Sequence, residues 1–181
     1  MAFERAIIFI DGSNFYHILK STFGSSKSMN DFDFQSFVKH ITQNKELIRT
    51  YYYSAPLDKN KDPAVYAKQQ KFFEELKKIP SFELILCRMQ KGKQNGKTTY
   101  MVKEDDIHIA VDMVKLAYNN AYDVAILVST DGDFVPAIEA VKERGKKVMN
   151  IGFETKFSWH LRQKSDEFSQ IKTKELEKMF K

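Results

Sequence analysis

Short apolar runs alternate with segments of helical periodicity along most of the chain. The apolar runs have the length of strands, and they are Arg5–Ile10, Ile48–Ser54, Phe82–Met89, Val124–Ser129 and Lys147–Ile151. The segments with helical periodicity are Ser13–Phe23, Asp33–Thr42, Pro63–Ile79, Lys103–Tyr118 and Phe134–Glu143. Because strands that alternate with helices form a mostly parallel sheet covered on both faces, the pattern predicts an α/β fold.

The length of the chain fits one domain of this architecture. The chain has 181 residues, of which 43% are hydrophobic, and this is enough for one full core. We expect a single domain with its core over residues 1–152.

The longest apolar runs are strand-sized and fall well short of the roughly 20 residues of a membrane span, so no membrane partner is predicted. A lone cysteine in an apolar run, Cys87, indicates a reducing, cytoplasmic location.

The tail, residues 153–181, is expected to add one or two short helices that pack on the edge of the sheet. Trp159 is expected to anchor this tail in the core. His160 has no acid or cysteine at ligand spacing, so we expect no catalytic role for it.

Aspartates stand at the carboxyl ends of two predicted strands. Asp11 closes the first strand, and Asp131 and Asp133 follow the fourth. Ligands of parallel sheets bind at these ends, near a switch in strand order. Taken singly, each aspartate could also be a turn residue or a helix cap. Their recurrence at two strand ends favours a site.

A third source of carboxylates is the segment KEDDIHIAVDM. On a helical wheel, Asp106 lines up with Ala110, Met113 and Ala117, so we expect it to face inward. The wheel places Asp105 and Asp112 on the outward face, where Asp112 can pair with Lys115.

Several carboxylates in one cleft need a compensating positive charge. Two of them at about 4 Å repel by roughly 4 kcal/mol at an effective dielectric constant near 20. Protons or a divalent cation can supply the missing charge. Oxygen ligands without a cluster of His or Cys favour Mg²⁺ or Mn²⁺ over zinc, so the sequence predicts a site for one of these ions.

The excess positive charge of the chain lies in one segment. Arg88–Lys103 contains five Lys or Arg and no acid, and the other residues hold 24 of each sign, because the chain has 29 basic and 24 acidic residues. A basic loop of this kind suits a phosphate backbone, which is bound electrostatically. A solvated hairpin that lysines keep soluble is the alternative.

Three segments in sequence order, FIDGSNFY, KEDDIHIAVDM and DVAILVSTDGDFVPAIEAVKERGKKV, resemble the motifs of the LabA-like branch of the NYN domain family, which is related to the PIN-domain nucleases. The motifs span Ile7 to Val148. The resemblance implies a PIN-like three-layer α/β/α sandwich with a mostly parallel central sheet, and a divalent-metal site that hydrolyses RNA. The chain departs from the family where Glu104 and Asp105 replace a Gly and an apolar residue, and where Thr130 replaces a Gly.

The resemblance and the basic segment together assign roles to individual residues. The catalytic residues would be Asp11, Asn14, Asp106, Asp131 and Asp133, and the four aspartates would bind one or two Mg²⁺ or Mn²⁺ ions. The residues expected to contact the substrate are Ser13, Arg88, Lys91, Lys93, Lys97, Lys103 and Ser129. The expected partner is single-stranded RNA, bound through its phosphate backbone, and Tyr100 is a candidate for stacking on its bases. Pairing of two copies into a homodimer stays open.

Three other functions can be weighed against a ribonuclease. A PIN-like module that binds RNA or nucleotide without cutting it is the main alternative, because Glu104 and Asp105 would repel a phosphate. A phosphotransferase of the haloacid dehalogenase type needs a second acid two residues after its nucleophilic aspartate, where this chain has Ser13. A dinucleotide-binding Rossmann domain needs G-x-G-x-x-G after the first strand, and this motif is missing there.

Overall fold

Six strands form one parallel sheet in a computed structural model that describes residues 3–94 and 97–181, with the backbone alone for residues 89–91, 93, 94 and 97–103. The order of the strands across the sheet is β3-β2-β1-β6-β7-β8. Their bounds are β1 (Arg5–Asp11), β2 (Glu46–Ser54), β3 (Phe82–Leu86), β6 (Val124–Val128), β7 (Lys147–Phe153) and β8 (Glu167–Ile171). The sheet confirms the predicted α/β class.

The strand order reverses between β1 and β6, which lie side by side at the centre of the sheet. The chain runs from β1 to β2 and β3 on one side, and from β6 to β7 and β8 on the other. Ile10 near the end of β1 pairs with Val128 at the end of β6. The carboxyl ends of these two strands therefore meet at the switch point, where sheets of this kind bind ligands.

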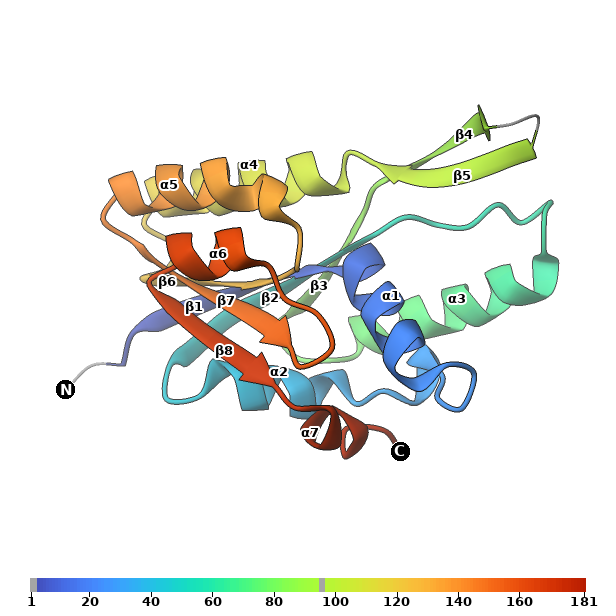
Figure 1. Ribbon diagram of the computed structural model, residues 1–181, viewed down its shortest axis with the longest axis horizontal. Coiled ribbons are helices and arrows are strands. Elements are labelled where there is room, and N and C mark those ends of the chain that lie inside the picture. Colours follow the sequence, from blue (N-terminus) through green and yellow to red (C-terminus); the bar gives the residue numbers. More distant parts are fainter. Residues whose placement is uncertain (1–2, 95–96) are drawn as a thin grey trace.

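Helices cover both faces of the sheet and form the outer layers of a three-layer α/β/α sandwich (Figure 1). One face carries α1 (Gly12–Phe23), α2 (Phe34–Thr42), α3 (Pro63–Lys77) and α7 (Thr173–Glu177). The other face carries α4 (Asp105–Tyr118), α5 (Val135–Glu143) and α6 (Trp159–Lys164). Residues of β1 alternate between the two cores: Ile8 and Ile10 face the first, and Ile7 and Phe9 face the second. Among residues 3–94 and 97–181, no helix is both long and apolar enough to cross a membrane.

Aspartates begin three of the helices on the first face by capping their free N–H groups. Asp11 accepts a hydrogen bond from the backbone of α1, Asp33 from that of α2 and Asp62 from that of α3. The capping that the sequence suggests for Asp11 is therefore present in the structure. It does not by itself explain the burial of this carboxylate, which is described below.

The basic segment forms a hairpin that projects from the body of the molecule (Figure 1). Its strands are β4 (Arg88–Gln94) and β5 (Lys97–Lys103), and they pair antiparallel. The predicted strand Phe82–Met89 is thus wrong at its end, because β3 stops at Leu86 and the chain turns into the hairpin. The predicted helix from Lys103 starts only after Glu104, whose φ of 74° separates β5 from α4.

The tail differs from the prediction in one element. Its two short helices, α6 and α7, are present, but residues Glu167–Ile171 form β8, which pairs parallel with β7. Trp159 was predicted to be a core anchor and is instead 61% exposed, with the guanidinium of Arg162 5.1 Å from its ring. Leu161 is the residue of α6 that is buried in the core.

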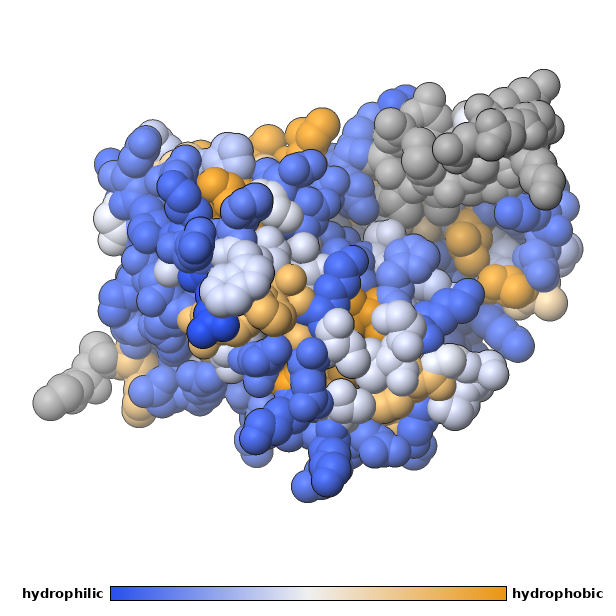
Figure 2. Space-filling model, viewed as in Figure 1, coloured by the Kyte–Doolittle hydropathy of each residue, from blue (hydrophilic) through white to orange (hydrophobic). Residues whose placement is uncertain are grey.

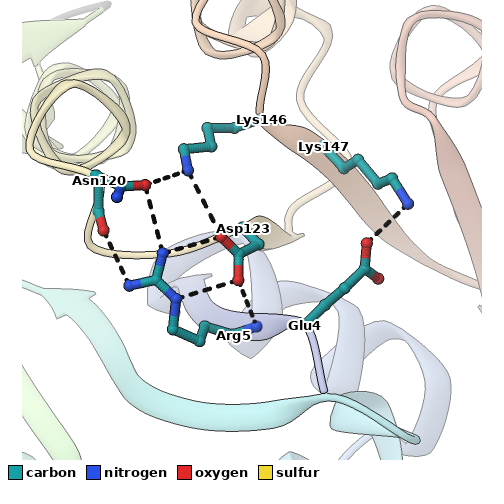
Figure 3. Close-up of polar contacts among 6 residues, drawn as sticks. All are labelled: Glu4, Arg5, Asn120, Asp123, Lys146 and Lys147. Atoms are coloured by element: carbon teal, nitrogen blue, oxygen red, sulfur yellow. Dashed lines mark hydrogen bonds and ion pairs between the residues drawn. The ribbon is translucent and has the colours of Figure 1, made fainter. Parts of the chain in front are cut away.

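The amino ends of β1 and β6 are joined by a network of polar contacts (Figure 3). Nη2 of Arg5 lies 2.9 Å from Oδ1 of Asp123, and Nε of Arg5 lies 3.1 Å from Oδ2. Lys146 and Asn120 complete the network. The hydrogen bonds from Arg5 lower the pKa of Asp123 to about 2. Charge is therefore well paired at this end of the sheet, opposite the predicted site.

Candidate functional site at the carboxyl ends of the strands

Asp11 is the most deeply buried carboxylate of the predicted site. It is 4% exposed at the end of β1. Its Oδ1 accepts a hydrogen bond from the backbone N–H of Asn14 at 2.9 Å, and its Oδ2 accepts one from the hydroxyl of Ser129 at 3.0 Å. Burial raises the pKa of Asp11 to about 7, against the effect of these hydrogen bonds, and the negative charges of Asp105 and Asp106 raise it further.

The loop after β6 brings a second carboxylate beside Asp11. The Oγ of Ser129 accepts a hydrogen bond from the backbone N–H of Asp131 at 3.2 Å while its hydroxyl donates to Asp11. Oδ1 of Asp131 accepts from the backbone N–H of Asp133 at 3.0 Å. Ser129 was expected to contact the substrate, but it is only 1% exposed. Its buried hydroxyl instead joins Asp11 to the backbone of Asp131.

Asn14 and Thr130 tie the start of α1 to the loop after β6. Oδ1 of Asn14 accepts hydrogen bonds from the backbone N–H and the hydroxyl of Thr130, both at 3.2 Å. Nδ2 of Asn14 lies 3.2 Å from the same hydroxyl oxygen. Thr130, one of the residues at which the chain departs from the family motif, therefore provides the partner for both ends of the Asn14 amide.

The inward face predicted for the first turn of α4 is wrong by one residue, because Asp105 and not Asp106 is buried. Asp105 heads the buried stripe of α4 and is 8% exposed, whereas Asp106 is exposed. Met113 and Ala117 are buried as expected, but the residue one turn before Met113 on this face is Ile109, and the next is Asp105. The helical wheel had assigned Ala110 and Asp106 to the buried face in their place.

Asp106 still faces the other acids. Although the residue is exposed, partial loss of hydration at its carboxyl group raises its pKa to about 6, and the charges of Asp105, Asp131 and Asp133 contribute to the rise. Asp112, by contrast, is set apart from them. It pairs with Lys115 at 2.9 Å, as predicted, but it also accepts a hydrogen bond from the hydroxyl of Tyr53 at 3.0 Å and so is less outward than expected.

A groove of about 1030 Å³ opens over these carboxylates, and Asp11, Asp105, Asp106 and Asp131 line it at one end. Within the part of the chain that the structure describes, no three His, Cys, Asp or Glu side chains stand close enough together to hold a metal ion as they are placed. The donor set is nevertheless the right one for a hard cation, because it consists of carboxylates without His or Cys. Burial is the main cause of the raised pKa values of Asp11 and Asp106, and the charges of neighbouring aspartates add to it, so a bound cation would favour the charged forms of both groups.

Gly12 lets the chain turn from β1 into α1 directly against β2. A Cβ atom at this position would meet the backbone oxygen of Tyr53 at less than contact distance and would also clash with the ring of Tyr52. Any other residue would push the start of α1, and with it the cap of Asp11, away from the sheet.

The residues predicted to contact the substrate are only partly placed. Ser13 is half-buried and lines the groove, and Arg88 is exposed and paired with Glu104 at 2.6 Å. The other four predicted contacts fall outside the residues whose side chains the structure describes, and they are Lys91, Lys93, Lys97 and Lys103. Their role stays a prediction.

Sequence reasoning missed a set of lysines that lines the rest of the groove. They come from α1, the loop that follows it, the loop before α3, α3 itself and the loop after β7, and they are Lys20, Lys27, Lys61, Lys68 and Lys156. They are far apart in the sequence, and no local run of charge marks them as a group.

Comparisons with known proteins agree with this architecture. A crystal structure of a protein of unknown function from Vibrio parahaemolyticus matches with a TM-score of 0.69 and 29% identity, over 93% of this chain and 93% of that one. An uncharacterized protein of Methanocaldococcus jannaschii is 46% identical over 61 residues, which are 34% of this chain and 25% of that protein. The model of the NYN domain matches residues 5–172, a range that includes all six strands of the sheet and every carboxylate of the site. The chain therefore belongs to the NYN domain family.

Proposed function

We propose that this chain is a divalent-metal-dependent ribonuclease that hydrolyses phosphodiester bonds of single-stranded RNA. Its family belongs to the PIN-like nuclease superfamily, which makes cleavage of RNA the first activity to consider. The observation that carries the proposal is the convergence of carboxylates from β1, from the loop after β6 and from α4 on one groove at the switch point of the sheet.

The proposed metal ligands are Asp11, Asp106, Asp131 and Asp133. Each oxygen of Asp11 accepts one hydrogen bond, which leaves a lone pair on each for a cation. Only Oδ1 of Asp131 accepts a hydrogen bond from the described residues. Bound Mg²⁺ or Mn²⁺ would supply positive charge to the attacking and leaving oxygens of a phosphodiester.

Residues around the carboxylates would keep them in place for this chemistry. Ser129 holds Asp11 and the backbone of Asp131 through one hydroxyl, so it fixes the spacing of the two strand ends. Asn14 and Thr130 join the same two segments a second time. In this proposal, Ser129, Asn14 and Thr130 are positioning residues, and Ser13 at the groove wall is the residue that would meet the substrate.

Cleavage of an end-labelled single-stranded RNA tests the proposal. Purified protein is incubated with Mg²⁺, Mn²⁺ or a chelator, beside Asp131→Asn and a control variant, Glu83→Gln, whose side chain is exposed and paired with Arg49 away from the groove. We expect cleavage that requires metal, persists in Glu83→Gln and is lost in Asp131→Asn. Equal rates with metal and with chelator would reject the metal-dependent mechanism.

A module that binds RNA without cutting it is the second candidate, and Asp105 is the observation in its favour. This buried carboxylate adds negative charge next to Asp11 and Asp106, where the phosphate would have to approach. Binding of RNA with no turnover in either metal, across several RNA sequences, would identify this function.

A further inference from the structure

We propose that the RNA strand runs from the carboxylates along the groove between α1 and α3 and that lysines on its walls hold the strand's phosphates. This inference rests on the proposed ribonuclease function and names the surface that holds the substrate. It differs from the expectation based on sequence, which placed the flanking strand on the basic hairpin.

Charge is divided along the groove. All the acids in its lining stand at one end, and they are Asp11, Asp105, Asp106 and Asp131. Beyond that end the charged side chains of the lining are all lysines: Lys20, Lys27, Lys61, Lys68 and Lys156. A strand with one phosphate at the carboxylates would therefore have its neighbouring phosphates beside positive charge.

Four of the groove lysines differ from many other lysines of the molecule. Lys77, Lys115, Lys147 and Lys164 each form an ion pair with an acid within 3.0 Å. Lys20, Lys27, Lys68 and Lys156 form no ion pair with any residue in the described ranges, and Lys20 and Lys27 lie over the rings of Tyr16 and Phe180 instead. Their charge is thus available to a ligand, and release of counterions from RNA would favour binding there.

The groove also presents aromatic rings that suit unpaired bases. Tyr16 is 44% exposed, and its ring lies 5.5 Å from that of His17 on the same wall. Bases of a single strand stack on such rings, whereas bases of a duplex are already stacked on one another. The charged side chains of the lining, acids at one end and lysines beyond them, favour a strand with several phosphates over an apolar small molecule.

The surface around α1 is consistent with this path. Figure 2 shows mainly hydrophilic residues on this face of the molecule, with apolar residues in small separate patches. Lys20, Lys68 and Lys156 are exposed, so their replacement should leave the fold intact. They are the residues of choice for a test.

The test measures RNA binding without cleavage. Every protein carries Asp131→Asn, and the dissociation constant for a labelled single-stranded RNA is measured in chelator over a range of salt concentrations. The groove variant adds Lys20→Gln, Lys68→Gln and Lys156→Gln. Since each phosphate contact on a single strand contributes about 0.7 to the slope of log K against log salt, we expect the slope to fall by about 2 and the affinity at 0.1 M salt to fall roughly tenfold or more.

A control variant carries the same change of charge outside the groove, in Lys39→Gln, Lys174→Gln and Lys178→Gln, which are exposed and do not line it. We expect it to bind as its parent does. An unchanged slope in the groove variant would overturn the inference, and so would an equal loss in the control. Equal loss of affinity for duplex and single-stranded RNA would overturn the single-strand assignment.

The outcomes separate this inference from the proposed function. Metal-dependent cleavage by the protein with intact Asp131, together with an unchanged slope in the groove variant, would keep the ribonuclease and reject the groove. Loss of slope in the groove variant without any cleavage would keep the groove and reject the ribonuclease. Failure of the parent to bind RNA, together with no cleavage by the protein with intact Asp131, would reject both.

Discussion

Asp11 is the residue at which the requirements of folding and of the proposed chemistry conflict. It caps α1 and receives a hydrogen bond from Ser129, and both contacts favour its charged form. Its burial favours the neutral form and prevails, because the pKa rises from the usual 3.8 to about 7. A carboxylate that caps a helix does not need this degree of burial, so we attribute it to the site.

The pKa of Asp11 predicts how stability depends on pH in the absence of metal. Between about pH 4 and pH 7 the folded protein binds a proton at Asp11 that the unfolded protein has released, so the free energy of unfolding should fall as the pH rises through this range. Asp11→Asn should raise the free energy of unfolding at pH 7.5 by on the order of 3 kcal/mol and flatten this dependence. Urea denaturation in chelator at pH 5 and pH 7.5 measures both effects. The same pH dependence in parent and variant would contradict the assignment.

The contact between Thr130 and Asn14 can be tested by replacing single residues. Thr130→Val keeps the shape of the side chain and the backbone N–H bond to Asn14 but removes the hydroxyl that contacts the amide. We expect the free energy of unfolding to fall by about 1 kcal/mol. In a double-mutant cycle with Asn14→Ala, the two losses should not fully add, because both variants lose the contact between the Asn14 amide and the Thr130 hydroxyl. Additive losses would show that the two side chains act separately.

The elements show which parts of the structure could be predicted from sequence. Strands β1, β6 and β7 are apolar runs buried on both faces, and β2 is a run of apolar and aromatic residues interrupted by Arg49; these signals gave the four strands within a few residues. β8 was missed because EFSQI is an edge strand with mixed polarity, and only Ile171 at its end is buried. Its place as a strand depends on pairing with β7, which no local pattern reveals.

The same distinction holds for the site. The aspartates at the ends of β1 and β6 could be placed together because parallel strands end at the same edge. The choice between Asp105 and Asp106 could not be made reliably, because the buried stripe of α4 depends on how the hairpin delivers the chain to Glu104. The groove lysines could not be grouped, because they come together only where α1, α3 and the loop after β7 line the same groove.

The tight turn from β1 into α1 should be sensitive to any side chain at Gly12. Gly12→Ala should lower the free energy of unfolding by about 2 kcal/mol or more, since its Cβ would overlap the backbone of Tyr53, which cannot move without disturbing β2. Gly24→Ala is the matched control: its φ of 62° opposes alanine, but no atom lies within 4 Å of the added Cβ, so a loss of about 1 kcal/mol is expected. Chemical denaturation compares the two. An equal or larger loss in Gly24→Ala would contradict the steric explanation.

At the scale of the whole molecule, a network of paired charges lies at one end of the sheet and the carboxylates of the proposed site lie at the other. At the amino ends of the strands, Arg5 and Asp123 neutralise each other, whereas at the carboxyl ends burial and neighbouring carboxylates raise the pKa values of Asp11 and Asp106. We therefore expect changes to the paired charges at the amino ends to leave activity unchanged, and changes to the carboxylates of the groove to reduce it.

Asp123→Asn tests this separation. Asp123 has a lowered pKa, so its contribution to stability is present above about pH 4 and is lost as the pH falls towards 2. Because the pair is partly exposed, we expect the variant to lose no more than about 1 kcal/mol at pH 7, with an unchanged rate of RNA cleavage per folded molecule. A large fall in the cleavage rate of folded protein would show that the two ends are coupled.

Calorimetric titration with Mn²⁺ tests most directly whether the carboxylates form one metal site. At pH 6.5, Asp11 with a pKa of about 7 is mostly protonated and Asp106 with a pKa of about 6 is partly so, and a bound cation must displace these protons. Titrations in buffers of different ionisation enthalpy should therefore show about one proton released per Mn²⁺ bound, and Asp11→Asn should abolish most of that release and weaken binding. Binding that releases no proton, or that is equal in Asp11→Asn and its parent, would contradict a metal site at these carboxylates.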